Sequence, residues 1–559
     1  MTESRPVDVE RIELGSIGSQ RGLIAMLERL ERARDAGPRT MLLLDARGTS
    51  GGWAARHEVR EALIDVRNAG GHVFAYVENA GLGDYYMASV AETIFMHPAG
   101  SLETYGLSSS SLYFRGALDK VGVKAEVIKI KEYKSAGERF SETAPTPADR
   151  EQREAIQKAI YEQVLFDIAQ ARGLTVQEVR TAFDDAPHGP TGAVERKLVD
   201  TITFRDELED EMGERVGAPV EIRAIPQTSP ENTTWTGKPY IAVVLVEGAI
   251  VDGPSRSIPF IGTQFAGGDT IAKTLRTVRA DPKCRGVVLR VDSPGGSALA
   301  SDIIWREVAR THEAHEADPD ASPPIVVSMS NVAASGGYYV AAGTDTIFVD
   351  PMTITGSIGV ITIHFDVSGL LEKLGISVST FKQGKNPDIG SIYKPYTADQ
   401  RAKVESSIAR TYDLFTQRVS EARDMTQDAV NDLGRGHVYA GKEAIRLDLA
   451  DRVGGLEDAI DYVRGEAGIK PRKDVEVRVL PRSPRLIDLI LDTVGDPFAG
   501  AGPVRAAKAR REQAKRDASL VGVLPKALTD VITRLPLSLL YLEQGQAHAI
   551  MPFVITTDD

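Results

Sequence analysis

The sequence predicts an α/β protein that consists of two tandem copies of one domain with mainly parallel sheets. The first observation is an internal repeat, because GDYYMASVAETIFMHP from Gly83 aligns without a gap with GGYYVAAGTDTIFVDP from Gly336. Gly336 follows Gly83 by 253 residues, and LEKLGISVSTFK around Gly375 follows LDKVGVKAEVIK around Gly122 by the same 253. Solenoid repeats are about 20–50 residues long, so this period indicates a duplicated domain.

The second observation is the alternation of short apolar runs with helical patterns. In the second copy the runs IAVVLV, GVVLRVD, PIVVSMS and DTIFVD are separated by stretches such as SDIIWREVARTHEAH. Strands that alternate with helices predict βαβ units and therefore a mainly parallel sheet. The polar run His315–Pro324 is expected to form a loop.

The repeat also sets the expected domain boundaries. We predict an N-terminal repeat domain over residues 1–224, a linker rich in Pro, Thr and Asn over 225–239, and a C-terminal repeat domain over 240–480. Residues 481–559 depart from the repeat and are predicted to form a helical C-terminal tail. Its basic run RAAKARREQAKR, residues 505–516, fits either a solvated helix or a helix attracted to an anionic membrane surface.

Composition excludes several classes of function. The chain has 559 residues and a net charge of −13, which argues against nucleic acid as a partner, because that binding needs a positive face. The single cysteine, Cys284, excludes an internal disulfide and a cysteine-rich metal site. The nine histidines have no metal-ligand spacing such as HExxH, so no metal is expected.

Targeting signals are also absent from the sequence as given. The opening MTESRPVDVERIELG lacks a charged region followed by an apolar run, and no stretch approaches the ~20 apolar residues of a membrane-spanning helix. Read from this start, the chain is expected to be cytoplasmic. A role at a membrane surface stays open.

Two glycine-containing turns of the second copy are candidates for chemistry. They are VDSPGGS, residues 291–297, and NVAASGGYYVAAG, residues 331–343. Ser335 would lie directly after a strand, at the N-terminus of a helix whose unpaired N–H groups favour negative charge. The N–H of Gly336, with one from Gly295 or Gly296, could then form an oxyanion hole. By itself, Ser-Gly-Gly after a strand also fits a tight turn with a helix cap.

A nucleophilic serine needs a base, and the second copy offers no histidine in a suitable context. His364 and His437 both lie in ordinary surroundings. A lysine can act as the base if burial lowers its pKa and keeps it neutral, as in Ser-Lys variants of the catalytic triad. The candidate is Lys134, in KEYKSAGERF of the first copy.

The repeat makes this candidate more specific. At the offset of 253 residues, Ser335 corresponds to Leu82 of the first copy, and Lys134 corresponds to Pro387 of the second copy. The first copy therefore has the lysine without the serine, and the second has the serine without the lysine. This complementary distribution predicts one composite site built across the two copies.

At these residues the sequence resembles the signal peptide peptidase A family, in its long duplicated form found in bacteria and plastids. The resemblance covers roughly residues 20–465 and rests on YKSAGERF, MSNVAASGGYYVA, VDSPGGS and the segment TGSIGVI from Thr355. It implies tandem Clp-protease/crotonase-like domains and a Ser-Lys dyad. The site residues that it implies are the nucleophile Ser335, the base Lys134, Ser357 as the hydrogen-bond partner of that lysine, and Gly336, Gly295 and Gly296 in the oxyanion hole.

The resemblance also implies what the protein acts on and assembles with. The expected activity is that of a serine endopeptidase on extended peptides, above all remnant signal peptides, with no cofactor. The expected assembly is a homotetramer in which each site lies between the two copies of one chain. The family is associated with membranes, and its long members usually carry an N-terminal anchor, which the sequence as given does not show.

Two other functions fit parts of the sequence. A crotonase-like enzyme would use a similar pair of N–H donors to stabilise an acyl-CoA enolate, but it has no evident need for Lys134 beside Ser335. A non-catalytic, membrane-associated oligomeric scaffold would account for the tail, but it leaves the complementary serine and lysine unexplained. The peptidase is therefore the favoured hypothesis.

Overall fold

The computed structural model describes residues 6–224, 237–258, 263–470, 472–482 and 548–550. Most of the predicted linker lies outside these residues, as does the tail from 483 to 547, which includes the basic run 505–516. We call residues 1–224 the N-terminal copy and residues 240–480 the C-terminal copy.

The N-terminal copy is built on a six-stranded sheet in which every neighbouring pair is parallel. In spatial order its strands are β6 (Thr201–Ile202), β4 (Thr93–Glu103), β3 (His72–Gly81), β2 (Met41–Asp45), β1 (Val7–Glu13) and β7 (Val220–Ala224). Its helices are α1 (Gln20–Ala36), α2 (Trp53–Asn68), α3 (Leu82–Ala88), α4 (Arg115–Val121), α5 (Glu138–Ser141), α6 (Pro147–Arg172), α7 (Val176–Asp184), α8 (Pro190–Glu195) and α9 (Leu208–Val216).

The C-terminal copy repeats this arrangement on an eight-stranded sheet. Its main path is β18 (Val438–Ala440), β16 (Ile354–Gly356), β14 (Ile325–Ala334), β12 (Cys284–Ser293), β8 (Tyr240–Glu247) and β20 (Glu476–Leu480), with β15 (Ile347–Val349) beside β14 and β19 (Arg452–Val453) beside β15. Its helices are α10 (Gly268–Ala280), α11 (Ala298–Ala317), α12 (Gly336–Ala341), α13 (Ser368–Lys373), α14 (Ala398–Arg423), α15 (Gln427–Leu433), α16 (Gly441–Arg446) and α17 (Leu456–Glu466). Only the pair β16–β18 is antiparallel. The predicted loop after residue 315 begins three residues later, because α11 continues to Ala317.

Matching hydrogen bonds show the duplication at atomic detail. The hydroxyl of Tyr85 donates to the carbonyl of Leu198, and that of Tyr338 donates to the carbonyl of Leu449, both at 2.8 Å. In each copy a tyrosine from the short helix that follows the third strand is thus held by the same kind of bond. The predicted tandem α/β architecture is confirmed.

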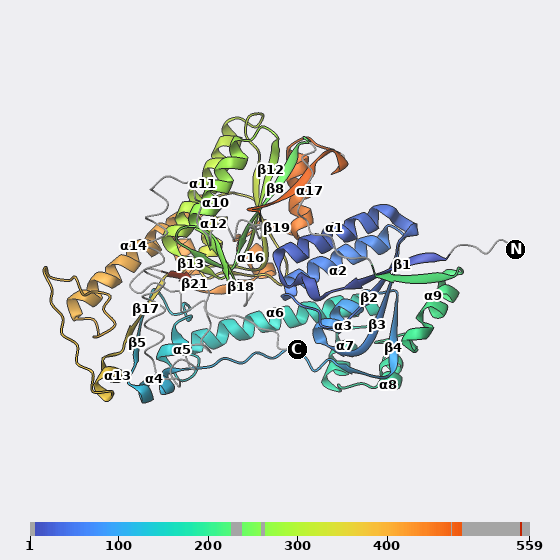
Figure 1. Cartoon of the computed structure of the whole chain (residues 1–559), viewed down its shortest axis with the longest axis horizontal. Coiled ribbons are helices and arrows are strands. Elements are labelled where there is room, and N and C mark those ends of the chain that lie inside the picture. Colours follow the sequence, from blue (N-terminus) through green and yellow to red (C-terminus); the bar gives the residue numbers. More distant parts are fainter. Residues whose placement is uncertain (1–5, 225–236, 259–262, 471, 483–547, 551–559) are drawn as a thin grey trace, which may run out of the picture.

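A third sheet joins the two copies. In spatial order it contains β10 (Arg256–Ile258), β11 (Thr263–Gly267), β9 (Ala249–Val251), β13 (Gly295–Ser297), β21 (His548–Ile550), β17 (Ile361–Asp366) and β5 (Lys124–Lys129). Strand β5 of the N-terminal copy pairs antiparallel with β17 of the C-terminal copy, with Lys129 opposite Ile361. Because Lys134 follows β5 and Ser357 precedes β17, this pairing brings the two segments together. Figure 1 shows α6 extending from the region of β5 and α5 to the N-terminal sheet.

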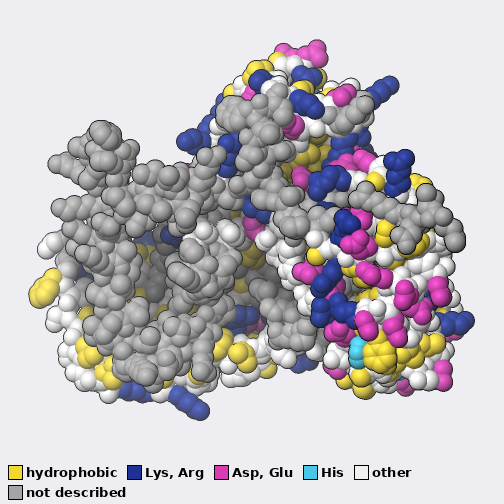
Figure 2. Space-filling model, turned by 45° about the vertical axis from the view of Figure 1, so that its right-hand side comes forward, with side chains coloured by type: hydrophobic (Ala, Val, Ile, Leu, Met, Phe, Trp, Pro, Cys, Tyr) yellow, Lys and Arg dark blue, Asp and Glu magenta, His cyan; other side chains and the backbone are white. Residues whose placement is uncertain are grey.

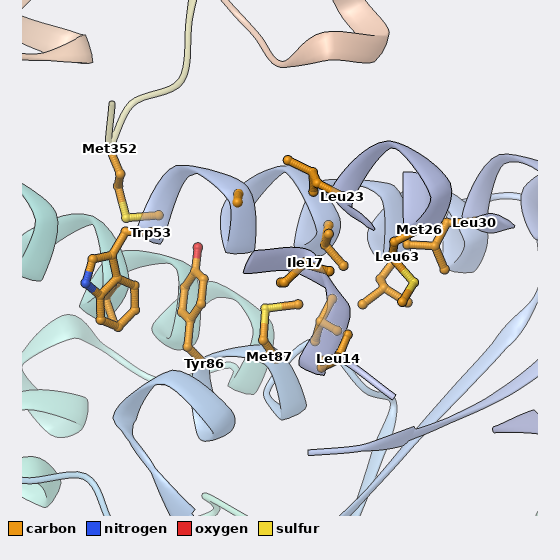
Figure 3. Packing of buried hydrophobic residues seen from close by; sticks show 14 of the residues in the cluster. Leu14, Ile17, Leu23, Met26, Leu30, Trp53, Leu63, Tyr86, Met87 and Met352 are labelled. Atoms are coloured by element: carbon orange, nitrogen blue, oxygen red, sulfur yellow. The ribbon is translucent and has the colours of Figure 1, made fainter. Parts of the chain in front are cut away.

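The two copies also share buried side chains. One hydrophobic cluster contains residues from both, and Figure 3 shows Met352 of the C-terminal copy reaching toward Trp53 and Tyr86 of the N-terminal copy. A buried ion pair joins Arg290 to Glu58 across the same boundary at 2.5 Å. Separating the two copies or removing one partner would leave a buried charge uncompensated, so this pair favours the observed packing.

Two features relate to the predictions about nucleic acid and the membrane as partners: the charge distribution on the surface and the length and polarity of the helices. On the face shown in Figure 2, Lys and Arg side chains are interspersed with Asp and Glu over the coloured part of the surface. Among the residues that the structure describes, every helix is too short or too polar to cross a membrane.

Candidate active site

Ser335 occupies the junction between β14, which ends at Ala334, and α12, which begins at Gly336. Its backbone has φ +57° and ψ −115°, a conformation that L residues rarely adopt and that is concentrated at functional sites. Two backbone hydrogen bonds hold it there, since Ser335 N donates to Gly356 O and Tyr339 N donates to Ser335 O, both at 2.8 Å. The side chain is completely buried in the chain as described.

Lys134 lies in the irregular segment between β5 and α5 and extends to this serine. Its Nζ is 2.5 Å from Ser335 Oγ, 2.9 Å from Ser357 O and 3.0 Å from Ser357 Oγ. The carbonyl of Ser357 can only accept, so Nζ donates to it. A neutral amine bound in this way keeps its lone pair for the proton of Ser335.

Burial sets the protonation state of the lysine. Lys134 has no exposed surface, and its desolvation lowers the pKa of the amine well below the usual range for lysine. The neutral form is the one that can accept a proton. The electrostatics therefore suit a general base.

The loop that precedes β18 shapes the site around the lysine. Ser357, at φ +53°, donates its N–H to the carbonyl of His437 at 2.6 Å. Gly436 has φ +82°, and a Cβ placed there would lie 2.5–2.7 Å from the N, Cα and Cβ of Lys134. Only glycine permits this approach. The residues around Gly436 give no sign of this requirement, because it comes from a segment about 300 residues away in the chain.

The glycines predicted for an oxyanion hole also come together. Gly336 is the first residue of α12, so its N–H has no carbonyl to bond within the helix. A Cβ on Gly336 would lie 3.1 Å from both Gly295 Cα and Gly296 N, and 2.6 Å from Ser301 Oγ. The N–H of Gly295 donates to Ser293 Oγ at 3.1 Å. Two turns of the C-terminal copy thus meet next to Ser335, with no room for a side chain.

An extended segment of the chain lies beside these glycines. The short strand β21 pairs antiparallel with β13, and Gly295, Gly296 and Ser297 lie opposite Ile550, Ala549 and His548. On its other side β21 pairs with β17, where residue 548 lies opposite Ile361. The space between β13 and β17 therefore accepts an extended backbone by main-chain pairing, the geometry of β-strand addition.

The histidines of the C-terminal copy have other contacts. His364 Nε2 is 3.0 Å from the carbonyl of Lys394. The ring of His437 packs against Tyr133 and Tyr439, with ring centroids 4.4 Å apart in both pairs. Neither arrangement presents an imidazole to Ser335, so the lysine remains the candidate base.

The positions equivalent to the dyad in the other copy lack the required groups. Leu82 begins α3 and is buried, and it supplies no hydroxyl. Pro387 lies in an exposed segment and supplies no amine. Of these two sets of equivalent positions, both of which the structure describes, one forms a Ser-Lys pair, namely Lys134 with Ser335.

Comparison with known proteins agrees with the duplicated fold. The model of peptidase family S49 matches the chain twice, over residues 65–218 and 317–470. The chain belongs to peptidase family S49. The first match contains Lys134, and the second contains Ser335 and Ser357. The chain is accordingly a serine peptidase of the long duplicated kind, which confirms the predicted family and enzyme class.

Named relatives support the same conclusion. The chain is 30% identical over 461 residues to "Serine protease SPPA, chloroplastic" of Arabidopsis thaliana, covering 80% of this chain and 66% of that protein. It is 30% identical over 519 residues to "Protease 4" of Salmonella typhi, covering 90% of this chain and 80% of that protein. A third relative, "Putative signal peptide peptidase SppA" of Enterococcus faecium, is 35% identical over 204 residues, covering 36% of this chain and 57% of that protein.

Proposed function

We propose that the chain is an endopeptidase that cleaves extended peptides with Ser335 as the nucleophile and Lys134 as the general base. The observation that carries the proposal is the buried contact of 2.5 Å between Lys134 Nζ and Ser335 Oγ. A nucleophile and its base within hydrogen-bond distance, with a third group orienting the base, are the mark of covalent catalysis. Here Ser357 orients the base through its carbonyl and hydroxyl oxygens.

The reaction follows from these contacts. Neutral Lys134 takes the proton of Ser335 as Oγ attacks the peptide carbonyl, and the resulting oxyanion is bound by the N–H of Gly336 together with one N–H of the glycine pair Gly295–Gly296. The lysine ammonium then gives its proton to the leaving amine as the C–N bond breaks. A water molecule, deprotonated by the same amine, releases the acyl group and restores Ser335.

The pairing of β21 supports the proposed substrate class. An extended peptide placed like β21 would bind through its backbone, so its main chain would contribute more to recognition than any single side chain. Remnant signal peptides are peptides of this kind, and the Enterococcus faecium relative is named for that substrate. The predicted homotetramer, contact with a membrane surface and lack of a nucleic-acid partner stay predictions.

The test is peptide hydrolysis by Ser335→Ala and Lys134→Met in the full chain. Each variant is expected to lower kcat on the order of 10⁶-fold, the loss found when a serine peptidase loses its nucleophile or its base. Lys131→Met is the matched control, because Lys131 is exposed and only three residues away. A fluorophosphonate should label the native chain and the Lys131→Met variant but not Ser335→Ala.

Three results would overturn the proposal. Substantial hydrolysis by both Ser335→Ala and Lys134→Met would show that the pair is not catalytic. Labelling of a serine that survives Ser335→Ala, together with retained hydrolysis, would move the nucleophile elsewhere. Binding of acyl-CoA with no hydrolysis of any peptide would favour the crotonase-like alternative instead.

A further inference from the structure

The segment that carries Lys134 is irregular, so something other than a helix or a strand must fix it. It runs from the end of β5 at Lys129 to the start of α5 at Glu138. Two backbone hydrogen bonds connect it to the C-terminal copy, from Ile130 N to Val360 O at 3.0 Å and from Tyr133 N to Arg435 O at 3.2 Å. An ion pair between Glu132 and Arg435 adds to them at the surface. These contacts all lie before Lys134 in the chain, so a base that must stay within 2.5 Å of Ser335 needs support on its other side as well.

The support comes from the N-terminal part of α6, where the buried face of the helix carries polar residues. The buried face of this helix includes Asp149, Gln152, Ile156 and Ile160, spaced three or four residues apart as in any helix that packs on a core. Asp149 and Gln152 are polar and lie in the first two turns, where α6 passes the lysine segment. A third buried polar residue, Gln163, lies farther along the helix and donates to Asp167. The large majority of buried polar side chains are hydrogen-bonded, so the partners of these two residues show what this end of α6 holds in place.

Gln152 makes bonds to the residues on both sides of Lys134. Its Nε2 donates to the carbonyl of Tyr133 at 3.1 Å and to Ser135 Oγ at 2.9 Å. Its Oε1 accepts from Val438 N at 3.3 Å. The side chain has no exposed surface.

The hydrogen bond between Gln152 Oε1 and Val438 N connects α6 to the C-terminal copy. Val438 lies on β18 opposite Gly356, and the preceding residue, His437, accepts the N–H of Ser357. Gln152 therefore fastens the segment of the base to the same loop and strand that hold Ser357. The buried carboxylate of Asp149 completes the arrangement, because Ser135 Oγ donates to it at 2.5 Å.

The corresponding helix of the C-terminal copy lacks this feature. Helices α6 and α14 both have 26 residues, and both have a threonine N-cap. The sixth residue is Gln152 in α6 and Lys403 in α14, and Lys403 is exposed. The copy without a catalytic lysine thus has no buried amide at this place.

We propose that Gln152 is a positioning residue that holds Lys134 against Ser335 by binding both of its neighbours and the strand beside Ser357. The inference rests on the proposed Ser-Lys mechanism. A displacement of about 1 Å at a reacting group can cost roughly 10²-fold in rate, so the loss of these bonds should act mainly on kcat. A loosened amine would also be better hydrated, which would raise its pKa and move the acid limb of the rate profile to higher pH.

The experiment compares Gln152→Met with Gln400→Met in the full chain. Gln400 is a matched control, since it is a buried glutamine near the start of α14 whose Nε2 donates to Asp388 at 3.0 Å, away from the dyad. For Gln152→Met we expect a fall in kcat of about 10²-fold with KM changed less than threefold, slower fluorophosphonate labelling and an acid limb at higher pH. Gln400→Met should keep the native kcat and pH profile.

A second variant keeps the test decisive if Gln152→Met does not fold. Gln152→Glu keeps the size and the acceptor but removes the amide donors, and a carboxylate here would favour the lysine ammonium, so its acid limb should also move to higher pH. The inference is overturned if a folded Gln152→Met keeps the native kcat and pH profile, or loses no more activity than Gln400→Met. If Gln152→Met does not fold, an unshifted profile of Gln152→Glu overturns it. A fully active Lys134→Met would instead refute the proposed mechanism itself.

Discussion

Lys134 Nζ and Ser335 Oγ lie 2.5 Å apart although 201 residues separate them in the chain. The lysine follows β5 of the N-terminal copy, and the serine lies between β14 and α12 of the C-terminal copy. The antiparallel pairing of β5 with β17 brings the two segments together. The duplication therefore produces one site from two chemically incomplete halves.

The pH dependence of hydrolysis should follow the protonation of Lys134. Because burial lowers the pKa of this amine, the neutral form should persist well below the pH at which an ordinary lysine, with a pKa of about 10.4, is protonated. The ratio kcat/KM should be flat at high pH and fall about tenfold per pH unit below the pKa of the buried amine. Steady-state rates across the stable pH range measure this. A rate that keeps rising up to about pH 10 would mean an ordinary lysine.

Removing the hydroxyl of Ser357 should weaken catalysis without abolishing it. In Ser357→Ala the amine of Lys134 loses the contact at 3.0 Å but keeps the one with the carbonyl of residue 357 at 2.9 Å. A hydrogen bond to a group that becomes charged contributes about 1.5–3 kcal/mol, so kcat should fall roughly 10- to 100-fold. Ser328→Ala is a suitable control, because Ser328 is also buried but contacts Arg290. Native kcat in Ser357→Ala would contradict its role in orienting the base.

The sequence was sufficient to predict much of this site. The repeat supplied the fold class. The first copy has Leu82 at the position equivalent to Ser335, and the second has Pro387 at the position equivalent to Lys134, which indicated a composite site. These inferences needed only residue types and a fixed offset. Ser357 was implied only by the resemblance of TGSIGVI to the signal peptide peptidase A family, and the structure places its hydroxyl on the lysine amine.

Other features depend on contacts that no local pattern records. Gln152 reads as one polar residue in an amphipathic helix, and its role emerges only when α6 is placed beside the lysine segment. Gly436 reads as a turn glycine until Lys134 is found against it. The only sequence signal for Gln152 is its spacing, since Asp149 and Gln152 continue the helical spacing of Ile156 and Ile160, and that spacing does not identify its partners.

Removing the strand β21 should make the site more accessible to peptides. Residues 548–550 occupy the space between β13 and β17 that we assign to substrate, so they compete with any peptide that binds there. The apparent affinity of a site falls in proportion to the fraction of molecules in which it is open. Deletion of residues 548–559 should therefore lower KM at least about fivefold and leave kcat unchanged.

The control for this deletion removes residues 551–559 alone and keeps β21, so KM should stay near the native value. A synthetic peptide with the sequence of residues 545–553 should restore the higher apparent KM when it is added to the shortened chain. An unchanged KM in the longer deletion would show that peptides bind elsewhere or that the strand is not a competitor.

Stability across the boundary of the two copies should depend on the protonation of His57. Its Nδ1 lies 2.6 Å from the carboxylate of Asp350. Burial by itself would lower the pKa of His57, but the charge of Asp350 outweighs it, together with Asp167 and Glu61, and raises the pKa to about 9. The folded-state pKa is therefore above the unfolded value of about 6.5, so the stabilisation is fully present below about pH 6.5 and is lost as the pH rises through about 9.

The substitution His57→Gln tests this dependence. We expect the free energy of unfolding to fall by about 3 kcal/mol at pH 6, and the deficit to shrink strongly by pH 10, because there the native histidine is neutral as well. Urea unfolding at pH 6, 8 and 10 gives the comparison. His72→Gln is the control, since His72 pairs with Glu92 inside one copy at a half-exposed site, where ion pairs contribute about 0–1 kcal/mol. An equal deficit for His57→Gln at pH 6 and pH 10 would mean that the side chain stabilises the boundary by packing and not by its charge.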